Sequence, residues 1–101
     1  MKETSDVSNR FYIYVFLSLK DRKLYIGFTT NLKSRLIEHA NGEVASTKLR
    51  RPLKLIYYEY FIDMKDAKVR ERFLKSGFGR SQLKLALKKT LQQFGYKFLQ
   101  S

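Results

Sequence analysis

Residues 11–29 read FYIYVFLSLKDRKLYIGFT, and this stretch decides the fold. Residues 11–19 are dense in aromatic and β-branched side chains, which is typical of a buried strand. The polar residues 20–22 separate this run from a second strand-like run at 23–29. Because the link is short but contains no Asn-Gly or Asp-Gly pair, we expect an antiparallel hairpin whose loop is longer than two residues.

The residues that follow the hairpin predict a helix and then a third strand. Thr30 or Asn31 can cap the helix, apolar residues recur in it with helical spacing, and Gly42 marks its end. Residues 43–52 are polar and basic, so we expect a loop there. Residues 53–62 read LKLIYYEYFI, which predicts the third strand.

Two further helices are predicted after the third strand. Asp63 is a good N-cap for the first of them, and Gly77 stops it. Ser81 can cap the last helix, whose leucines recur with helical spacing. The order β-β-α-β-α-α implies an α+β fold, a three-stranded and mainly antiparallel sheet flanked by helices. We expect residues 10–98 to form a single domain and residues 1–9, which lack apolar periodicity, to form a disordered tail.

The composition excludes several classes of protein. The chain has 101 residues, of which 44% are hydrophobic, so it can bury a core of its own. It has no cysteine and one histidine, which excludes a disulfide framework, a thiolate metal site and a histidine-rich zinc site. It shows no run of 18 apolar residues and no apolar leader segment, so we expect a cytoplasmic protein without a membrane partner.

The charge of the chain points to a polyanionic partner. There are 21 Lys and Arg residues against 9 Asp and Glu residues, a formal net charge of +12. The excess is largest in residues 61–101, where ten basic residues stand against three acidic ones. A net positive charge this large on a domain of this size is typical of proteins that bind nucleic acid.

Candidate site residues lie on the predicted hairpin and on the helix after it. Tyr14 and Tyr25 can be cross-strand neighbours on one face of the hairpin, and Gly27 leaves room for a ligand to approach the second strand closely. Arg35 and His39 are four residues apart, which puts both side chains on one face of the helix. These residue types can bind a phosphate group and transfer protons.

Short motifs occur in a definite order along the chain. Residues 12–14 read YIY, residues 25–27 read YIG, Arg35 and His39 form an R-x-x-x-H pair, and Glu71 follows on the helix after the third strand. Taken together, these motifs resemble the GIY-YIG nuclease superfamily, with YIY at the place of the GIY triplet and Glu71 at the place of the family's glutamate. The resemblance covers most of the chain and is strongest to the small single-domain members.

The resemblance implies a metal-dependent endonuclease that hydrolyses DNA phosphodiester bonds. Glu71 would be the sole protein ligand of one Mg²⁺ or Mn²⁺ ion, and Arg35 would bind the scissile phosphate. Tyr14 or Tyr25 would be the general base, and the sequence does not separate the two. His39 would accept the proton of the tyrosine or orient the nucleophile. Domains similar to this one occur in homing endonucleases, in restriction enzymes and in DNA repair.

Other cations are expected to hold the DNA backbone without reading bases, so that the intrinsic sequence specificity is low. The predicted DNA-binding residues are Lys33, Lys48, Arg50, Arg51, Arg70, Arg72 and Lys75. The expected substrate is branched, damaged or single-stranded DNA. The alternative is a catalytically inactive nucleic-acid-binding module of the same fold, whose binding would be salt-sensitive but would leave DNA uncut.

Overall fold

The central feature of the fold is a three-stranded sheet. The computed structural model describes residues 10–98, and the predicted tail at 1–9 lies outside them. The strands are β1 (Phe11–Ser18), β2 (Leu24–Thr29) and β3 (Leu53–Phe61), in the spatial order β2-β1-β3. Both pairings of β1 are antiparallel, which confirms the predicted hairpin and the antiparallel sheet of the α+β fold.

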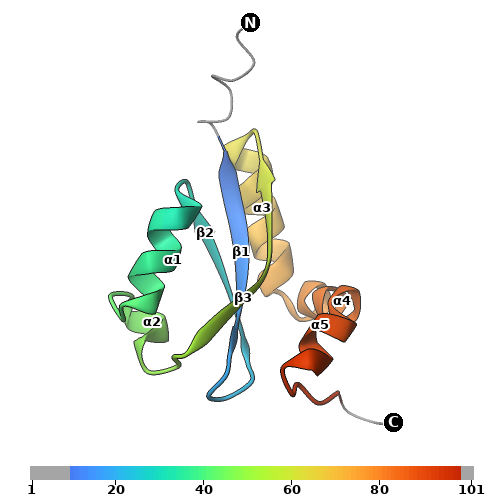
Figure 1. Ribbon diagram of the computed structural model, residues 1–101. Helices are drawn as coiled ribbons and strands as arrows, with labels where there is room; N and C mark the ends of the chain where they lie inside the picture. Colours follow the sequence, from blue (N-terminus) through green and yellow to red (C-terminus); the bar gives the residue numbers. More distant parts are fainter. Residues whose placement is uncertain (1–9, 99–101) are drawn as a thin grey trace, which may run out of the picture.

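Helices cover both faces of the sheet (Figure 1). On one side lie α1 (Leu32–Ala40) and the short α2 (Ala45–Lys48), and on the other lies α3 (Met64–Lys75). After α3 come α4 (Gly77–Ala86) and α5 (Lys88–Gln93), which lie at the end of the sheet where the hairpin turns. The central strand β1 is therefore enclosed from both sides.

Capping residues explain where α1 and α3 begin. Asn31 is the N-cap of α1, and its side chain accepts a hydrogen bond from the backbone N–H of Ser34 at 3.1 Å. Asp63 caps α3 in a similar way, through the N–H of Lys65 at 2.7 Å. Beyond the other end of α1, Gly42 has a φ of +77°, a left-handed conformation that glycine adopts without strain. The predicted boundaries are confirmed at these three places.

Two expectations about the helices are wrong. The segment at 43–52 is not wholly a loop, because it contains α2, whose Thr47 is fully buried. The last helix does not begin at Ser81. It begins at Gly77 with Ser76 as its N-cap, and it is interrupted near residue 87, so that two helices stand where one was predicted.

A close contact between α3 and α4 explains the early start of α4. The side chain of Ser76 accepts a hydrogen bond from the backbone N–H of Gly79 at 3.1 Å. A Cβ atom on Gly79 would lie 1.9 Å from the carbonyl oxygen of Phe73, so a glycine is needed where the two helices meet. Gly77 follows the end of α3 as predicted and also begins α4, and Gly79 in the first turn of α4 allows the two helices to pack this closely.

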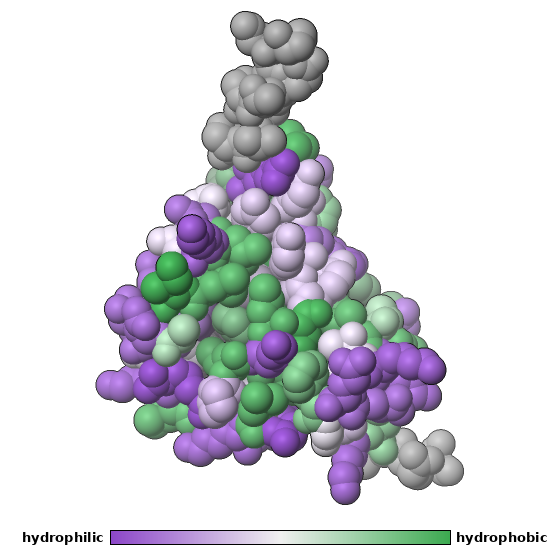
Figure 2. Space-filling model, in the orientation of Figure 1, coloured by the Kyte–Doolittle hydropathy of each residue, from purple (hydrophilic) through white to green (hydrophobic). Residues whose placement is uncertain are grey.

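The two faces of the sheet bury different kinds of side chain. The face toward α3 holds an apolar core, which is made by Ile13, Val15, Leu17, Leu24, Ile26, Ala67, Leu74, Leu83 and Leu91. On the face toward α1 and α2, β1 buries Tyr14, Phe16 and Ser18 instead. On the surface shown in Figure 2, hydrophobic residues gather near the centre and hydrophilic residues surround them. Within residues 10–98, no helix is long and apolar enough to cross a membrane.

Candidate active site

The aromatic face of the sheet brings both predicted tyrosines together. In the β1–β2 register, Tyr14 lies opposite Gly27 and Phe16 lies opposite Tyr25, so that the two tyrosines are diagonal neighbours. Their ring centroids are 6.3 Å apart. The ring of His39, from α1, packs edge-on against Phe16 at 4.8 Å and against Tyr25 at 5.4 Å. Residues from the hairpin and from α1 therefore share one aromatic cluster.

A buried chain of hydrogen bonds runs through this cluster. The hydroxyl of Tyr14 lies 2.9 Å from Nε2 of His39, and Nδ1 of His39 lies 2.7 Å from Oγ1 of Thr47. The exposed fraction of all three residues is 1% or less. Because every polar group in a dry site needs a partner, the three side chains hold one another in place.

Thr47 is the residue at this site that sequence reasoning missed. It lies on α2, in the segment predicted to be a loop, and a single threonine in a polar segment carries no recognisable signal. Its neighbour Ser46 lies on the same short helix and donates a hydrogen bond to the hydroxyl of Tyr25 at 3.3 Å. The short helix α2 thus contacts both the histidine and the second tyrosine of the site.

Burial controls the protonation of the two central groups. It lowers the pKa of His39 to about 4, and the positive charge of Arg35 acts in the same direction. Burial also raises the pKa of Tyr14, while Arg35, beside the hydroxyl, opposes this rise. At neutral pH the imidazole is therefore uncharged and the phenol keeps its proton, which gives the chain of hydrogen bonds one proton acceptor beside one proton donor.

Gly27 has a different role from the expected one. A Cβ atom at this position would lie 2.3 Å from Cζ and 2.4 Å from the hydroxyl oxygen of Tyr14. The space that the glycine leaves is thus filled by the ring of Tyr14 and not by a ligand. The YIG glycine allows the tyrosine of the first motif to lie across β2 and reach His39.

Arg35 lies at the exposed margin of the cluster. Its Nη1 pairs with Oε1 of Glu38 at 2.7 Å, and about a third of its side chain is accessible. It lines an open pocket of about 370 Å³, together with residues 28–31 at the end of β2 and Ser34. The guanidinium group can therefore meet a phosphate from solvent while it remains close to the hydroxyl of Tyr14.

Glu71 lies in the opposite helix layer from His39, on the other side of the sheet. It lies on α3, its side chain is 15% exposed, and its two oxygens contact Nζ of Lys75 at 2.9 Å and Nζ of Lys68 at 3.4 Å. Burial opposes ionisation, but the two ammonium groups hold the pKa of Glu71 below its usual value. Its negative charge also contributes to the raised pKa of Tyr14. Glu71 is therefore an ionised carboxylate within electrostatic reach of Tyr14.

This carboxylate fits the predicted metal ligand. Both of its oxygens already contact a cationic group, which shows that positive charge is favourable there. In the described part of the chain, no group of three or more acidic or histidine side chains could hold a metal ion. The donor set at Glu71 is thus a single carboxylate, which suits a hard cation that keeps most of its shell as water and phosphate oxygens.

Some of the predicted DNA-binding side chains are held by carboxylates. Nε of Arg50 lies 3.2 Å from Asp21, beside the hairpin turn. Arg70 pairs with Glu59 of β3 at 2.7 Å, and the hydroxyl of Tyr57 donates to the same carboxylate at 2.7 Å. Lys75 is the partner of the site glutamate described above, whereas Lys33 and Arg72 are exposed. The predicted set therefore does not form one uniform surface.

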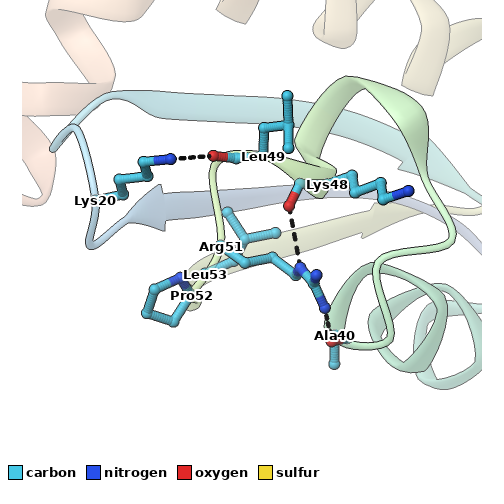
Figure 3. A pocket seen from close by; sticks show the side chains of 7 residues that line it. All are labelled: Lys20, Ala40, Lys48, Leu49, Arg51, Pro52 and Leu53. Carbon is cyan, nitrogen blue, oxygen red and sulfur yellow. Dashed lines mark hydrogen bonds between the residues drawn. The ribbon is translucent and has the colours of Figure 1, made fainter.

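The remaining two predicted cations line a separate pocket. Lys48 and Arg51 lie at a pocket of about 550 Å³, shown in Figure 3. Nε of Arg51 donates to the carbonyl oxygen of Lys48 at 3.1 Å, and Nη1 donates to that of Ala40 at 3.2 Å. On the other side, Lys20 donates to the carbonyl oxygen of Leu49 at 3.1 Å. Arg51 therefore joins the end of α1 to the segment that leads into β3.

The order of the site motifs along this fold agrees with one protein family. A family profile described as the GIY-YIG catalytic domain matches residues 10–84, from the start of β1 into α4. The chain belongs to the GIY-YIG family. Its nuclease-type domain implies a nucleic-acid substrate, and GIY-YIG nucleases generally depend on divalent metal ions.

Bacterial relatives of similar size share this GIY-YIG chain's sequence over most of its length. A UPF0213 protein of Clostridium perfringens is 37% identical over 87 residues, which cover 85% of this chain and 92% of the relative. A UPF0213 protein of Staphylococcus saprophyticus is 38% identical, over 76% and 94% of the two chains. One of Pediococcus pentosaceus is 44% identical, over 79% and 84%. No solved structure matches the GIY-YIG chain.

Proposed function

We propose that this chain is a metal-dependent endonuclease that hydrolyses DNA phosphodiester bonds, with one domain over residues 10–98 carrying the site. The observation that carries the proposal is the buried chain Tyr14–His39–Thr47 beside an accessible arginine. A buried tyrosine hydroxyl needs a hydrogen-bond partner, and a neutral imidazole is a partner that can also accept its proton.

Tyr14 is the proposed general base, and the hydrogen bonds give it a route for its own proton. In the tautomer with the proton on Nδ1, His39 donates to Oγ1 of Thr47 and leaves Nε2 free to accept from Tyr14. When Tyr14 takes a proton from the attacking water, its own proton can pass to Nε2. A bound phosphate raises the proton affinity of His39, because its negative charge offsets that of Arg35. Tyr25, which contacts Ser46 instead, is the proposed positioning partner.

Arg35 and Glu71 are the proposed groups that stabilise charge. Arg35 would bind the scissile phosphate through its guanidinium fork after it leaves Glu38. Glu71 would hold the single Mg²⁺ or Mn²⁺ ion, which when bound neutralises charge on the phosphate and on the leaving oxygen. For this, Glu71 must release Lys68 and Lys75, and ion pairs of this kind cost little to break.

Exposed tyrosines beside the site favour a DNA substrate with unpaired bases, such as branched, damaged or single-stranded DNA. Tyr12, Tyr58 and Tyr60 lie on neighbouring strands, with ring centroids about 6 Å apart, and the latter two are 51% and 44% exposed. The guanidinium group of Arg10 lies over the ring of Tyr60 at 4.4 Å. Such rings can stack on bases of any identity, which agrees with low sequence specificity.

Cleavage assays test the proposal directly. Supercoiled plasmid, a branched substrate and a single-stranded oligonucleotide are incubated with wild type, Glu71→Gln or Arg35→Ala, in Mg²⁺ and in Mn²⁺. The matched controls are Glu43→Gln and Lys65→Ala, which remove equivalent charges from exposed positions outside the site. We expect wild type and controls to cut and both site variants to lose at least a hundredfold in rate.

Two results would contradict this proposal. One is a wild-type protein that cuts none of the substrates in either metal, and the other is full activity in both site variants. A protein that binds DNA with salt sensitivity but never cuts it, and whose binding is indifferent to Glu71→Gln, would support the inactive binding module instead.

A further inference from the structure

A second basic site lies at the end of the hairpin, away from the tyrosines. A pocket of about 450 Å³ opens between the β1–β2 turn, α4 and the segment after α5. Five cationic side chains line it, which are Arg22, Lys23, Arg50, Arg80 and Lys84. They come from the turn, from the segment before β3 and from α4. Residues that are up to 62 positions apart along the chain therefore meet here, which happens only in the folded protein.

The guanidinium groups of this basic pocket converge although they repel one another. Arg50 and Arg80 both donate to the carbonyl oxygen of Leu24, at 3.5 Å and 3.4 Å. Arg50 also pairs with Asp21, but within residues 10–98 no other cation of the pocket forms an ion pair. Four positive charges therefore share a concave surface without an acidic partner, an arrangement that a polyanion would stabilise.

The backbone of Arg22 is a second unusual feature of the pocket. Arg22 has a φ of +61°, a left-handed conformation that residues other than glycine, asparagine and aspartate rarely adopt. Its guanidinium group donates to the carbonyl oxygen of Leu19, and a Cβ atom on Gly95 would lie 3.3 Å from its Nε. The turn thus holds an arginine that lines the pocket in a sparsely populated backbone conformation, and such conformations are common at functional positions.

We propose that the basic pocket binds the phosphate backbone of the DNA at a distance from the scissile phosphate. This proposal rests on the proposed function, because it assumes that DNA is the substrate. The pocket and the catalytic cluster are joined by β2, which is an edge strand of the sheet. From Leu24 at the pocket to Phe28, which lines the pocket of Arg35, an extended strand rises about 13 Å, which corresponds to about four nucleotides along one strand of a DNA duplex.

Salt-dependent binding tests the pocket without any need for cleavage. Binding of a fluorescein-labelled 24-base-pair duplex is measured by anisotropy across a range of NaCl concentrations, without divalent ions. Wild type is compared with the double variant Lys23→Gln/Lys84→Gln and, separately, with Arg80→Gln. The matched control is Lys65→Gln/Lys89→Gln, which removes two exposed lysines that do not line the pocket.

We expect the slope of log K against log salt to fall by about 0.9 for each lost phosphate contact, and hence by about 1.8 in the double variant. Affinity at 0.1 M salt should fall about tenfold or more. The control should keep the wild-type slope within a few tenths. Thermal unfolding shows whether a variant has folded. In the described residues the main side-chain contact of the two lysines is that of Lys84 with the ring of Tyr96, 5.5 Å from its Nζ, so their replacement should leave the fold intact.

Equal slopes in the pocket variants and in the control would overturn the proposal. The outcome is separable from that of the proposed nuclease. If wild type fails to cut DNA but the pocket variants alone lose salt-dependent affinity, the pocket proposal stands and the nuclease proposal fails. If wild type cuts and the pocket variants bind like wild type, the nuclease proposal stands and the pocket proposal fails.

Discussion

The central strand β1 is buried on both faces of the sheet, but different forces hold the two faces. Toward α3, residues such as Ile13, Leu17 and Leu74 exclude water by apolar packing. Toward α1 and α2, Tyr14, His39 and other polar residues are just as inaccessible, and hydrogen bonds satisfy them. No buried side-chain nitrogen or oxygen in the described part of the chain lacks a partner.

This difference shows how a domain of this size can be stable and still hold reactive groups. Apolar packing tolerates side chains of similar size but supplies no chemistry. A buried hydrogen-bonded chain contributes less net free energy, but it fixes the orientation and protonation of each member. Substitutions on the two faces should therefore have different signatures, with loss of stability on one and loss of activity on the other.

The largest effect is expected from Tyr14→Phe, on the polar face. The ring, which fills the space beside Gly27, is kept, and only the hydroxyl is lost. If this hydroxyl is the general base, cleavage should slow by about 10²- to 10⁴-fold. Single-turnover cleavage measures the rate, and Tyr57→Phe is the control, because its hydroxyl bonds to Glu59 of β3, outside the proposed catalytic cluster. If Tyr14→Phe cuts at the wild-type rate, the hydroxyl of Tyr14 is not the general base, and the polar face does not differ from the apolar face in this way.

Leu74→Ala, on the apolar face, should lower the stability of the protein but leave the rate of cleavage nearly unchanged. Leu74 is 1% exposed in the core, so truncation leaves a cavity and should lower the free energy of unfolding by about 2–5 kcal/mol. Urea denaturation measures this loss, and cleavage at low temperature, where the variant is still folded, should remain close to the wild-type rate. The exposed Leu85 provides the control, since Leu85→Ala should change stability by less than about 0.5 kcal/mol.

Low pH should lower the free energy of unfolding, because the buried imidazole of His39 on the polar face must then take up a proton. Its pKa is about 4 in the folded protein and near 6.5 in the unfolded chain, so the unfolded state binds more protons between these values. Stability is therefore complete above pH 6.5 and falls as the pH drops toward 4, by about 3 kcal/mol in all and about 2 kcal/mol between pH 7 and pH 5.

A variant without the titrating group isolates this effect. His39→Gln should be less stable than wild type at pH 7, but its free energy of unfolding should decline less between pH 7 and pH 5. Urea denaturation at the two pH values measures both declines. Parallel declines in wild type and variant would mean that His39 is not held neutral by burial.

The smallest expected effect is that of Thr47→Val. Valine preserves the shape but removes the partner of Nδ1 of His39, which leaves a buried polar group unsatisfied and should cost about 1–3 kcal/mol. Cleavage should also slow, because the tautomer of His39 is no longer fixed. Thr30→Val, at an exposed position, is the matched control for stability. If both variants unfold alike, the hydrogen bond to Thr47 contributes nothing to the polar face.

The fold could be predicted from the sequence wherever a signal is local. The hairpin, the third strand and the caps Asn31 and Asp63 follow from periodicity and capping chemistry over a few residues. The prediction failed where long-range packing decides the outcome. The helix after β3 ends before Gly77 as predicted, but the next helix starts at Gly77, where Gly79 packs closely against Phe73, and not near Ser81.

The antiparallel hairpin, the excess of positive charge and the order of the site motifs can all be read from the chain alone. Each is a property of nearby residues or of composition. The packed layers alone show that Tyr14, and not Tyr25, forms a hydrogen bond with His39, that Thr47 completes this chain and that Gly27 makes room for the ring of Tyr14. They also show that Arg22 and Arg80 share one pocket. Such contacts join segments that are far apart in the chain. Burial shifts the pKa of the groups that make these contacts, and these groups become buried only when the helices pack against the sheet.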